Sequence, residues 1–434
     1  MTMFLGGALL PHPPILLPAI GQGREKEAAA TLQACGEAAR EIASWEPDVL
    51  VLISPHAPSK ARAVAVNASE SLKGSLRAFG FPQEEQCWNG ASELAKSLVT
   101  AWGRGGISCQ EQEQELDHGA LVPLYFLAQA GCKAKVVTVS FGALAQRQYY
   151  EMGQILRRLI LAGTQRVAVI ASGDLSHRVT RNAPAGDHPA GEQFDKQVVA
   201  ALGQGDAETL LHLPWELQEE AGECGLRSIL FLLGACGSEP LVRHLSYEAP
   251  FGVGYAVTLL RENQQMAFPV ELAWSSIRHY LQQRTLWLGP AELPEEWKRP
   301  SAAFVSLKKE GVLRGCIGTF APTQPSLAAE IIRNAVLAAT EDPRFEPVRE
   351  EELQTLQLSV DVLSEPEKVA SETQLDPKEY GVIVQQGPRR GLLLPDLEGV
   401  DTVEEQLRIA KRKAGIAETA AVELFRFRVC RYGV

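Results

Sequence analysis

Four of the eight histidines stand in short motifs of one kind, in which an apolar run breaks into a turn that carries the imidazole. The motifs are Leu-Pro-His12-Pro-Pro, Ser-Pro-His56-Ala-Pro, Leu-Asp-His118-Gly and Gly-Asp-Leu-Ser-His177. A single histidine in such a turn is usually structural, but four in equivalent positions predict a metal site. Imidazole ligands suit a borderline metal such as Fe or Zn better than Mg or Ca, which prefer oxygen.

The elements that must position these histidines are strands of an open sheet. Apolar runs at 3–10, 48–54 and 166–172 precede His12, His56 and the Asp174/His177 turn, and each is typical of a strand buried on both faces. Ligands of open α/β sheets gather beyond the carboxyl ends of the strands, so we expect these side chains to converge. His118 differs, because it opens the apolar helical segment 120–130 with Asp117 as the predicted N-cap.

Length and composition limit the class of protein. A chain of 434 residues predicts two domains, which we place at 1–262 and 266–434. The net charge of −11 and the absence of a basic block argue against nucleic acid as a partner. Prolines interrupt the apolar N-terminus and no other segment is long enough to span a membrane, so we expect no membrane association. Eight cysteines without a C-x-x-C pair predict reduced thiols and a cytoplasmic location.

Elements alternate between strand and helix in the first domain. Beyond the three strands above, helices are predicted at 25–44, 91–102 and 148–162, and strands at 133–139 and 252–260. This rhythm predicts an α/β fold with a mostly parallel central sheet flanked by helices. The polar stretch 261–265 is predicted to be a linker.

The pattern of predicted elements changes after this linker. The sequence predicts a helix at 272–283, a hairpin at 302–320, a second helix at 327–340 and a strand with one solvent-exposed face at 356–362. Another hairpin is predicted across Gly387-Pro388. This mixed order predicts a smaller α+β domain.

The ordered motifs resemble those of a known superfamily. Residues 5–260 resemble the class III extradiol ring-cleaving dioxygenases of the catalytic B-subunit (LigB) type, together with their Memo-like relatives that are not dioxygenases. The resemblance implies that His12 and His56 are metal ligands and that His177 is the acid/base that moves a substrate hydroxyl proton. It implies that His118 hydrogen-bonds the substrate. Asp174 would orient His177 at the substrate site, or only cap the turn.

The third metal ligand has two candidates in the segment Ala-Gly-Glu223-Cys224-Gly. The resemblance to ring-cleaving members implies a carboxylate, which favours Glu223, whereas Memo-like members carry a cysteine, which favours Cys224. A carboxylate suits Fe(II) and oxygen activation, and a thiolate suits Zn or Cu(I). We prefer Glu223. The alternative for this residue is an exposed carboxylate near a helix start, and Arg227, one helical turn further on, could serve an acidic substrate or pair with Glu223.

The second half resembles the AMMECR1 domain, with the motif Leu-Arg314-Gly-Cys316-Ile-Gly and the segments Asp342-Pro-Arg-Phe and Gly391-Leu-Leu-Leu-Pro. Residues two apart on a strand share a face, so Arg314 and Cys316 project together. A guanidinium beside a thiol favours the thiolate, so Cys316 is a candidate catalytic residue and Arg314 a candidate substrate-binding residue. A buried packing role for Cys316 is the alternative.

Together the two resemblances imply an oxidoreductase of the extradiol type. Its cofactor would be Fe(II), with Zn or Cu as alternatives, and its substrates a catechol or aminophenol and dioxygen. The competing hypothesis is a Memo-like metal-binding scaffold that works with a radical-SAM protein in a modification pathway and cleaves no ring. The resemblance is also compatible with a homo-oligomer.

Overall fold

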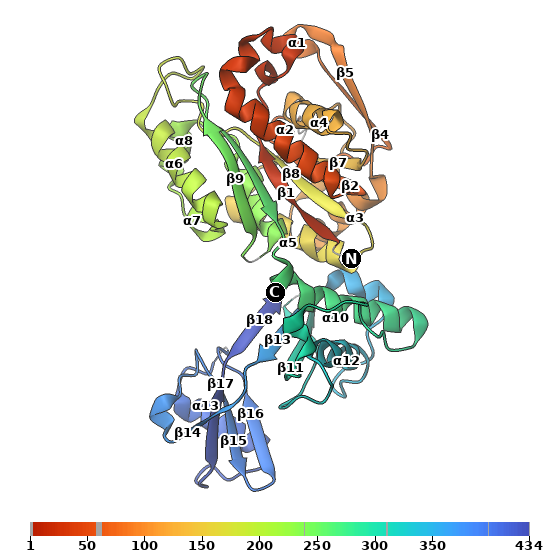
Figure 1. Ribbon diagram of the computed structural model, residues 1–434, viewed down its shortest axis with the longest axis vertical. Helices are drawn as coiled ribbons and strands as arrows, with labels where there is room; N and C mark the ends of the chain where they lie inside the picture. Colours follow the sequence, from red (N-terminus) through yellow and green to blue (C-terminus); the bar gives the residue numbers. More distant parts are fainter. Residues whose placement is uncertain (1–2, 58–62, 238, 310, 398, 434) are drawn as a thin grey trace. The chain divides into compact units, whose positions relative to one another are not determined.

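The chain divides into two compact units, Met1–Asn263 and Gln264–Val434. The computed structural model describes residues 3–57, 63–237, 239–309, 311–397 and 399–433 (Figure 1). The N-terminal unit is α/β, with a mostly parallel sheet between helices, and the C-terminal unit is a smaller α+β fold, as the sequence predicts.

An eight-stranded sheet forms the centre of the N-terminal unit. Its middle strands run parallel, since β1 pairs with β8, β8 with β2 and β2 with β7, while β10 and β9 extend it antiparallel. In spatial order the strands are β6 (Cys109–Glu111), β3 (Val64–Val66), β7 (Lys135–Ser140), β2 (Val49–Ser54), β8 (Val167–Ser172), β1 (Phe4–Leu10), β10 (Tyr255–Arg261) and β9 (Leu241–Glu248).

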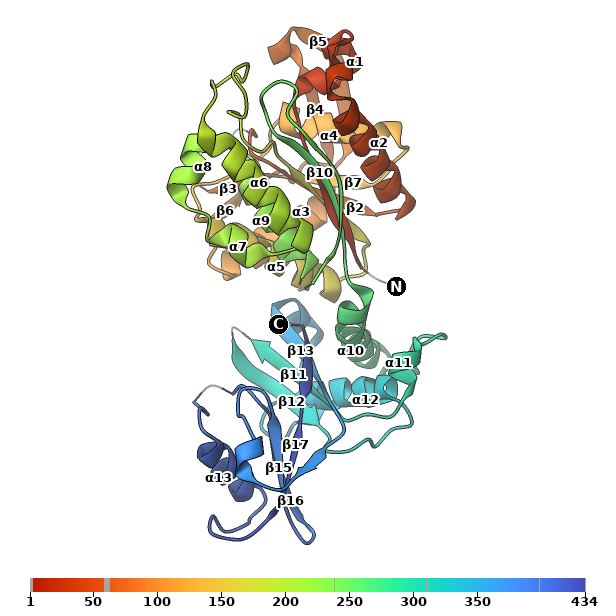
Figure 2. The same ribbon diagram turned by 60° about the vertical axis from the view of Figure 1, so that its left-hand side comes forward.

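Helices cover both faces of this sheet, because the central strands β2 and β8 are buried along their whole length and need an apolar cover on each side (Figure 2). One hydrophobic cluster joins one face to α3 (Ser92–Arg104), α5 (Gln146–Ala162), α6 (Pro189–Gln204) and α9 (Leu226–Cys236). The other cluster joins the opposite face to α2 (Ala29–Ser44) and α4 (His118–Gln129).

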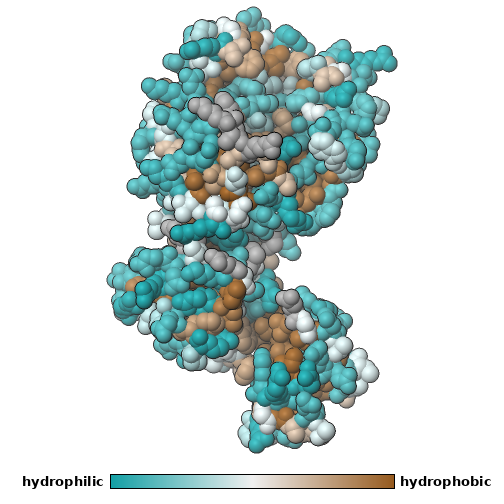
Figure 3. Space-filling model, turned by 180° about the vertical axis from the view of Figure 1, so that it is seen from behind, coloured by the Kyte–Doolittle hydropathy of each residue, from teal (hydrophilic) through white to brown (hydrophobic). Residues whose placement is uncertain are grey.

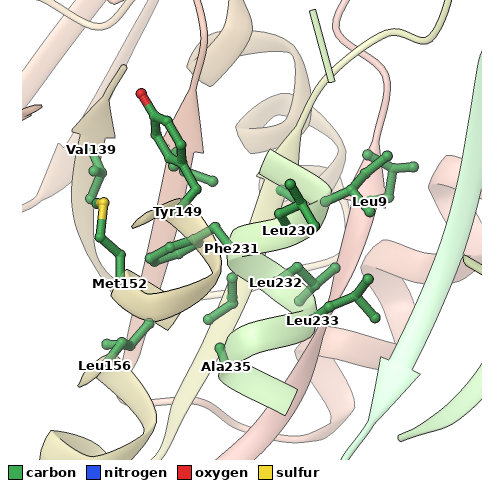
Figure 4. Packing of buried hydrophobic residues seen from close by; sticks show 14 of the residues in the cluster. Leu9, Val139, Tyr149, Met152, Leu156, Leu230, Phe231, Leu232, Leu233 and Ala235 are labelled. Atoms are coloured by element: carbon green, nitrogen blue, oxygen red, sulfur yellow. The ribbon is translucent and has the colours of Figure 1, made fainter. Parts of the chain in front are cut away.

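The closest helix pair, α5 and α9, packs through two glycines. Figure 4 shows Tyr149 and Met152 of α5 against Phe231 of α9. A Cβ added to Gly153 would lie 2.1 Å from the Phe231 carbonyl oxygen, and one added to Gly234 would lie 2.1 Å from that of Tyr150. Neither helix position therefore accepts a side chain without the two helices moving apart.

The predicted elements of this unit agree with the structure except at their ends. The predicted helix 25–44 begins with a 3-10 turn, Arg24–Ala28, before α2, and α4 begins at His118 with Asp117 as its N-cap. A two-stranded arm, β4 (Ser71–Leu76) and β5 (Phe81–Asn89), was not predicted, and neither were β3, β6, β9 and α6. The remaining helical elements are Pro14–Leu16, α1 (Pro18–Gly21), Arg77–Phe79, α7 (Ala207–Leu211) and α8 (Trp215–Ala221).

The C-terminal unit contains two four-stranded antiparallel sheets. The first consists of β12 (Val312–Gly318), β11 (Ala303–Lys309), β13 (Leu356–Leu363) and β18 (Val429–Gly433), and packs on α10 (Gln264–Gln283) and α12 (Leu327–Thr340). The second consists of β14 (Glu367–Val369), β17 (Glu423–Phe427), β15 (Gly381–Gln386) and β16 (Arg389–Leu393), and packs on α13 (Val403–Lys413). Short helical turns stand at α11 (Glu295–Lys298), Glu350–Thr355 and Glu372–Gln374.

The predicted linker 261–265 contains the boundary between the two units, at Asn263 and Gln264, but it is shorter than predicted. Strand β10 continues to Arg261 and α10 begins at Gln264, eight residues before the predicted helix start at 272. The polar residues concealed this start, but Ala267 and Val270 are buried and give the early turns of α10 an apolar face.

The face in Figure 3 is mostly hydrophilic, and no helix among the described residues is long and apolar enough to cross a membrane.

Candidate metal centre

Three site residues stand just beyond the carboxyl ends of three neighbouring parallel strands. His12, His56 and Asp174 each lie two positions past a strand end, at Leu10, Ser54 and Ser172. Strand β8 lies between β1 and β2, and its Ser172 pairs in register with Leu10. The sheet therefore delivers three side chains from distant parts of the sequence to one point, as the strand-end argument predicts.

Cys224 reaches the same point from the turn that precedes α9. This turn and the Asp174 turn touch through glycines, because a Cβ added to Gly173 would lie 2.4 Å from the Cα atom of Gly225. The backbone N–H of Asp174 points at Cys224 Sγ over 3.4 Å. The thiol is thus held beside the strand ends by backbone packing that only glycine allows.

The donor atoms form two overlapping groups. His12, His56 and Cys224 each offer an atom within 4.8 Å of the others, and so do Asp174, His177 and Cys224. His12 Nε2 lies 3.0 Å from His56 Nε2 and 3.6 Å from Cys224 Sγ. Cys224 Sγ lies 4.0 Å from His177 Nε2. Five donor-bearing side chains therefore surround one small volume.

The tautomer of His12 follows from its second nitrogen. The Ser172 hydroxyl donates to the carbonyl of Gly119 at 2.5 Å, so at 2.8 Å it must accept from the Nδ1–H of His12. This leaves Nε2 as a lone pair that faces the site. Burial, only partly opposed by Asp174, lowers the pKa of His12 to about 4, so the ring is neutral at physiological pH.

His177 and Asp174 form a coupled pair on the other side. The Nδ1–H of His177 donates to the carbonyl of Gly222 at 2.6 Å, so Nε2 faces inward, 3.8 Å from Asp174 Oδ2. Interaction with Asp174 outweighs burial and raises the pKa of His177. Burial alone would raise the pKa of Asp174, but His12 and His177 hold it below its usual value. Asp174 also accepts the backbone N–H of His12 at 3.0 Å, so it positions both rings.

Glu223 is engaged by its own turn. Its side chain accepts the backbone N–H of Leu226 at 2.7 Å and lies 3.9 Å from Arg227 Nη1. It caps the turn before α9 and pairs one helical turn along, as its alternative role predicts, but its side chain is buried and not exposed. The geometry favours Cys224 over Glu223 as the third donor, contrary to the preference drawn from the sequence.

His118 stacks on the ligand side of the site without reaching its centre. Its ring lies 4.4 Å from that of His56 in a stacked arrangement, and the Phe79 ring meets its edge at 5.2 Å. Asp117 fixes the helix start by accepting from the N–H of Ala120 at 2.8 Å, and it also accepts from the Ser54 hydroxyl at 2.7 Å. Burial lowers the pKa of His118, so it too is neutral.

The arrangement fits a cation with mixed nitrogen and sulfur ligands. Two neutral imidazole nitrogens point at each other over 3.0 Å beside a thiol, and burial raises the pKa of that thiol well above its usual value. A divalent ion would satisfy both lone pairs and stabilise the thiolate, with release of the thiol proton. The Ser172 and Gly222 acceptors are the outer partners that fix ring orientation at such sites.

A pocket of about 990 Å³ opens above these donors. His12, His56, His118, Asp174 and His177 line its floor. The walls are mostly apolar or aromatic and include Pro13, Pro14, Ile15, Ile20, Phe79, Pro184, Phe251 and Val253. Polar groups stand at a few points, among them Arg24, Asn182 and Tyr255. A mostly apolar cavity with convergent polar groups at its floor is typical of a small-molecule site.

The two candidate residues of the C-terminal unit do not act together as predicted. Arg314 is engaged elsewhere, because its guanidinium donates to Glu352 at 3.0 and 3.2 Å and to the Glu346 carbonyl at 2.7 Å. The cation that meets Cys316 is Arg344, which donates to the Cys316 carbonyl at 3.2 Å. The predicted partnership of Arg314 with Cys316 is therefore replaced by one with Arg344.

Sequence reasoning missed two residues of the N-terminal site. Ser172, the last residue of β8, could have been found from its position at a strand end beside the end of β1. Phe79 could not, because it stands at the tip of the unpredicted β4–β5 arm and no local pattern links it to His118.

Comparison with family models gives two matches that together span most of the chain. Residues 6–258 match the model described as the catalytic LigB subunit of aromatic ring-opening dioxygenase, and residues 270–432 match the AMMECR1 model.

Similar proteins carry the comparison further. A protein of Clostridium acetobutylicum is 37% identical over 467 residues, which cover 98% of each chain. A Thermotoga maritima protein is 56% identical over 166 residues, 38% of this chain and 95% of its own. Among solved structures, an uncharacterised Pyrococcus horikoshii protein is 31% identical, with a TM-score of 0.37 over 39% of this chain and 90% of its own.

Proposed function

The chain belongs to the family of the catalytic LigB subunit of aromatic ring-opening dioxygenases and carries an AMMECR1 domain after it in the sequence. From this premise we propose that the N-terminal domain is a metal-dependent oxidoreductase of the extradiol type. Its substrate would be a small aromatic diol or aminophenol. One observation carries this proposal. Donor atoms of His12, His56 and Cys224 converge within 4.8 Å of one another, and the two histidines line a pocket large enough for an aromatic ring.

His12, His56 and Cys224 are the proposed metal ligands. When bound, an ion such as Fe(II) supplies a Lewis-acidic centre with open positions for a catecholic substrate and dioxygen. Zn or Cu is compatible with the same donors, and the thiol favours the softer ions. Ser172 keeps the His12 ring aimed at the ligand position by accepting its other N–H.

His177 is the proposed acid/base. Its Nε2 faces the site, while Gly222 and Asp174 fix the ring from the two sides. In that position Nε2 can accept a proton from a substrate hydroxyl and return it later in the reaction. Asp174 stabilises the protonated ring, because its carboxylate lies 3.8 Å from Nε2. His118 and Phe79 present rings to the same pocket, where a planar substrate can contact them.

An oxygen-uptake experiment tests this function. We expect anaerobically purified full-length protein loaded with Fe(II) to consume dioxygen with a member of a catechol and 2-aminophenol panel. His177→Ala should retain the iron but lose turnover by a factor of about 10²–10⁴. His244→Ala, on edge strand β9, is the matched control and should behave as wild type. Stoichiometric iron without oxygen uptake across the panel would exclude ring cleavage.

A second function is favoured by one specific observation, the thiol of Cys224 in the place where ring-cleaving relatives are expected to carry a carboxylate. Under this function the domain is a metal-binding scaffold that works with a radical-SAM partner and cleaves no ring. It predicts tight, stoichiometric binding of Cu(I) or Zn by the wild type and no oxygen uptake by the Fe(II) form. If the wild-type protein neither takes up oxygen nor binds any of these metals, both functions are contradicted.

A further inference from the structure

One sheet face of the C-terminal unit carries the thiol of Cys316 and the hydroxyl of Ser306 side by side. On β11 and β13, Val305, Leu307 and Val360 are buried in the core. Ser306 alternates with them and pairs in register with Cys316 of β12. A Cβ added to Gly315 would lie 2.1 Å from the Ala338 carbonyl oxygen of α12, so Gly315 faces α12 and Cys316 faces the opposite side. The thiol therefore lies on the face that α12 leaves uncovered.

The backbone of Cys316 is held on both sides by an ion pair. Its N–H donates to Asp342 Oδ2 at 2.8 Å and its carbonyl accepts from Arg344 Nη2 at 3.2 Å. Asp342 and Arg344 in turn bind each other at 2.7 and 2.9 Å. The position of the thiol is thus fixed without the thiol itself being used.

The thiol is only partly buried, unlike those of Cys35 and Cys236. The Ser306 hydroxyl lies 3.2 Å from its sulfur. A packing role would bury the sulfur among apolar atoms, as happens to Cys35 and Cys236. The surroundings of Cys316 therefore argue against the packing role that the sequence left open.

Two cationic side chains lie near this thiol. The Arg344 guanidinium donates to the carbonyl of Cys316 itself at 3.2 Å, and Lys413, at the end of α13, lies within electrostatic reach of Cys316 and Arg344. The side chain of Arg344 is 55% exposed, so it is accessible to a solute. Asp342 balances one of the two charges, and no acidic side chain of the described residues forms an ion pair with Lys413. The cluster keeps a positive charge beside the sulfur.

We propose that Cys316, Arg344 and Lys413 form a second reactive site, which binds a small carboxylate and presents the Cys316 sulfur to an electrophilic carbon next to it. The carboxylate pairs with the two cations and the sulfur attacks the adjacent carbon. A sulfur–carbon bond forms, the leaving group departs with its electron pair, and the thiol proton passes to solvent. This site does not depend on the function proposed for the N-terminal domain.

Paired alkylating reagents test the site on the full-length chain. Iodoacetate carries the carboxylate and iodoacetamide is its neutral equivalent, and both lose iodide to the attacking sulfur. Peptide mass spectrometry gives the rate of each reagent at Cys316, and the ratio of the two rates is compared with the ratio for the same residue in urea-unfolded protein. We expect the ratio in the folded protein to be at least about tenfold higher at low salt and to fall as salt is added. The exposed Cys87 should show no such increase.

Charge variants separate a built site from a general field. Lys413→Gln should lower the folded ratio at least about threefold while leaving the iodoacetamide rate unchanged. Arg412→Gln removes the same charge from the neighbouring exposed position and should leave the ratio as it is. Arg344 also holds the backbone carbonyl of Cys316 in β12, so the iodoacetamide rate of Arg344→Gln reports whether that part of the strand has moved. Equal ratios in folded and unfolded protein, an unreactive Cys316, or equal effects of Lys413→Gln and Arg412→Gln would overturn the proposal.

Discussion

The Nε2 atoms of His12 and His56 lie 3.0 Å apart although the residues are 44 positions apart in the sequence. Ser172 fixes the His12 proton on the other nitrogen, so the His12 lone pair has to meet either a proton on His56 or a cation. The same two nitrogens stand beside the Cys224 sulfur.

His12→Ala and His56→Ala should therefore each abolish stoichiometric metal uptake. Removal of a ligand costs more than the roughly 10–100-fold in affinity that loss of an outer hydrogen-bond partner costs. Anaerobic equilibrium dialysis followed by elemental analysis measures the bound metal. His244→Ala is the control that removes an imidazole outside the site, and full occupancy in His12→Ala would show that the ligand assignment is wrong.

Cys224 and Glu223 should separate cleanly in the same measurement. Cys224→Ser removes a soft donor 3.6 Å from His12 Nε2 and should weaken Zn or Cu(I) binding by about 100-fold or more. Glu223→Gln should keep the affinity and lower the free energy of unfolding by about 1 kcal/mol, because it weakens the pairing with Arg227 but keeps an acceptor for Leu226. If Glu223→Gln weakened metal binding and Cys224→Ser did not, the carboxylate of Glu223 would be the ligand.

Gly153→Ala should destabilise the N-terminal unit. The new methyl group would lie 2.1 Å from the Phe231 carbonyl oxygen and would force α5 and α9 apart, at a cost of about 1–3 kcal/mol in the free energy of unfolding. Gly103 of α3 has no atom within 4 Å of an added Cβ, so Gly103→Ala should stabilise by up to about 1 kcal/mol. Urea denaturation of the two variants compares them, and equal effects would contradict the close helix crossing.

Asp195 should make the stability of the fold depend on pH. It is fully buried, accepts from the Ser176 N–H at 2.8 Å and from the Tyr247 hydroxyl at 2.7 Å, and burial raises its pKa to about 7. The unfolded carboxyl ionises near its usual value of 3.8, so between that pH and about 7 the folded state binds more protons than the unfolded state. The free energy of unfolding should therefore fall as pH rises through this window.

Asp195→Asn keeps an oxygen that accepts from the Ser176 N–H, and its NH2 group can donate to the Tyr247 hydroxyl oxygen, so the variant should remove this fall. At pH 8 the variant should be more stable than wild type by on the order of 1–3 kcal/mol. Thermal denaturation from pH 4 to 8 measures the slope, and the exposed Asp187→Asn should leave it unchanged. A variant whose slope matches that of wild type would show that Asp195 does not carry the effect.

The parts of the fold that the sequence predicts are those with strong local patterns. Strand β2 is apolar along its whole length and α12 repeats its apolar residues at helical spacing, so both were placed from residue types alone. The same patterns placed His12 and His56 at the carboxyl ends of two strands, and therefore at the same edge of the sheet. The start of α10 was lost because Gln264 and Gln265 are polar, so the apolar face that begins at Ala267 and Val270 was not recognised as part of the helix.

The remaining details depend on contacts between distant segments. Glu223 and Cys224 are neighbours in sequence, and only the contact of Gly225 with Gly173 decides that the sulfur faces the histidines. In the same way, simple alternation predicts a shared face for Arg314 and Cys316, but the register of β12 shifts at Arg314, Glu352 binds its guanidinium, and Arg344 comes from the turn after α12. No spacing rule within a single segment contains this information.

The contact between Gly173 and Gly225 joins two turns that are translated at different times. A growing polypeptide that has left the ribosome only as far as β8 holds His12 and His56, but Cys224 has not yet emerged. Under the proposed ligand set, tight metal binding must therefore wait until the turn before α9 has docked on the Asp174 turn. We expect metal loading to be a late step in the maturation of this protein, and chains truncated before Cys224 to lose the ion.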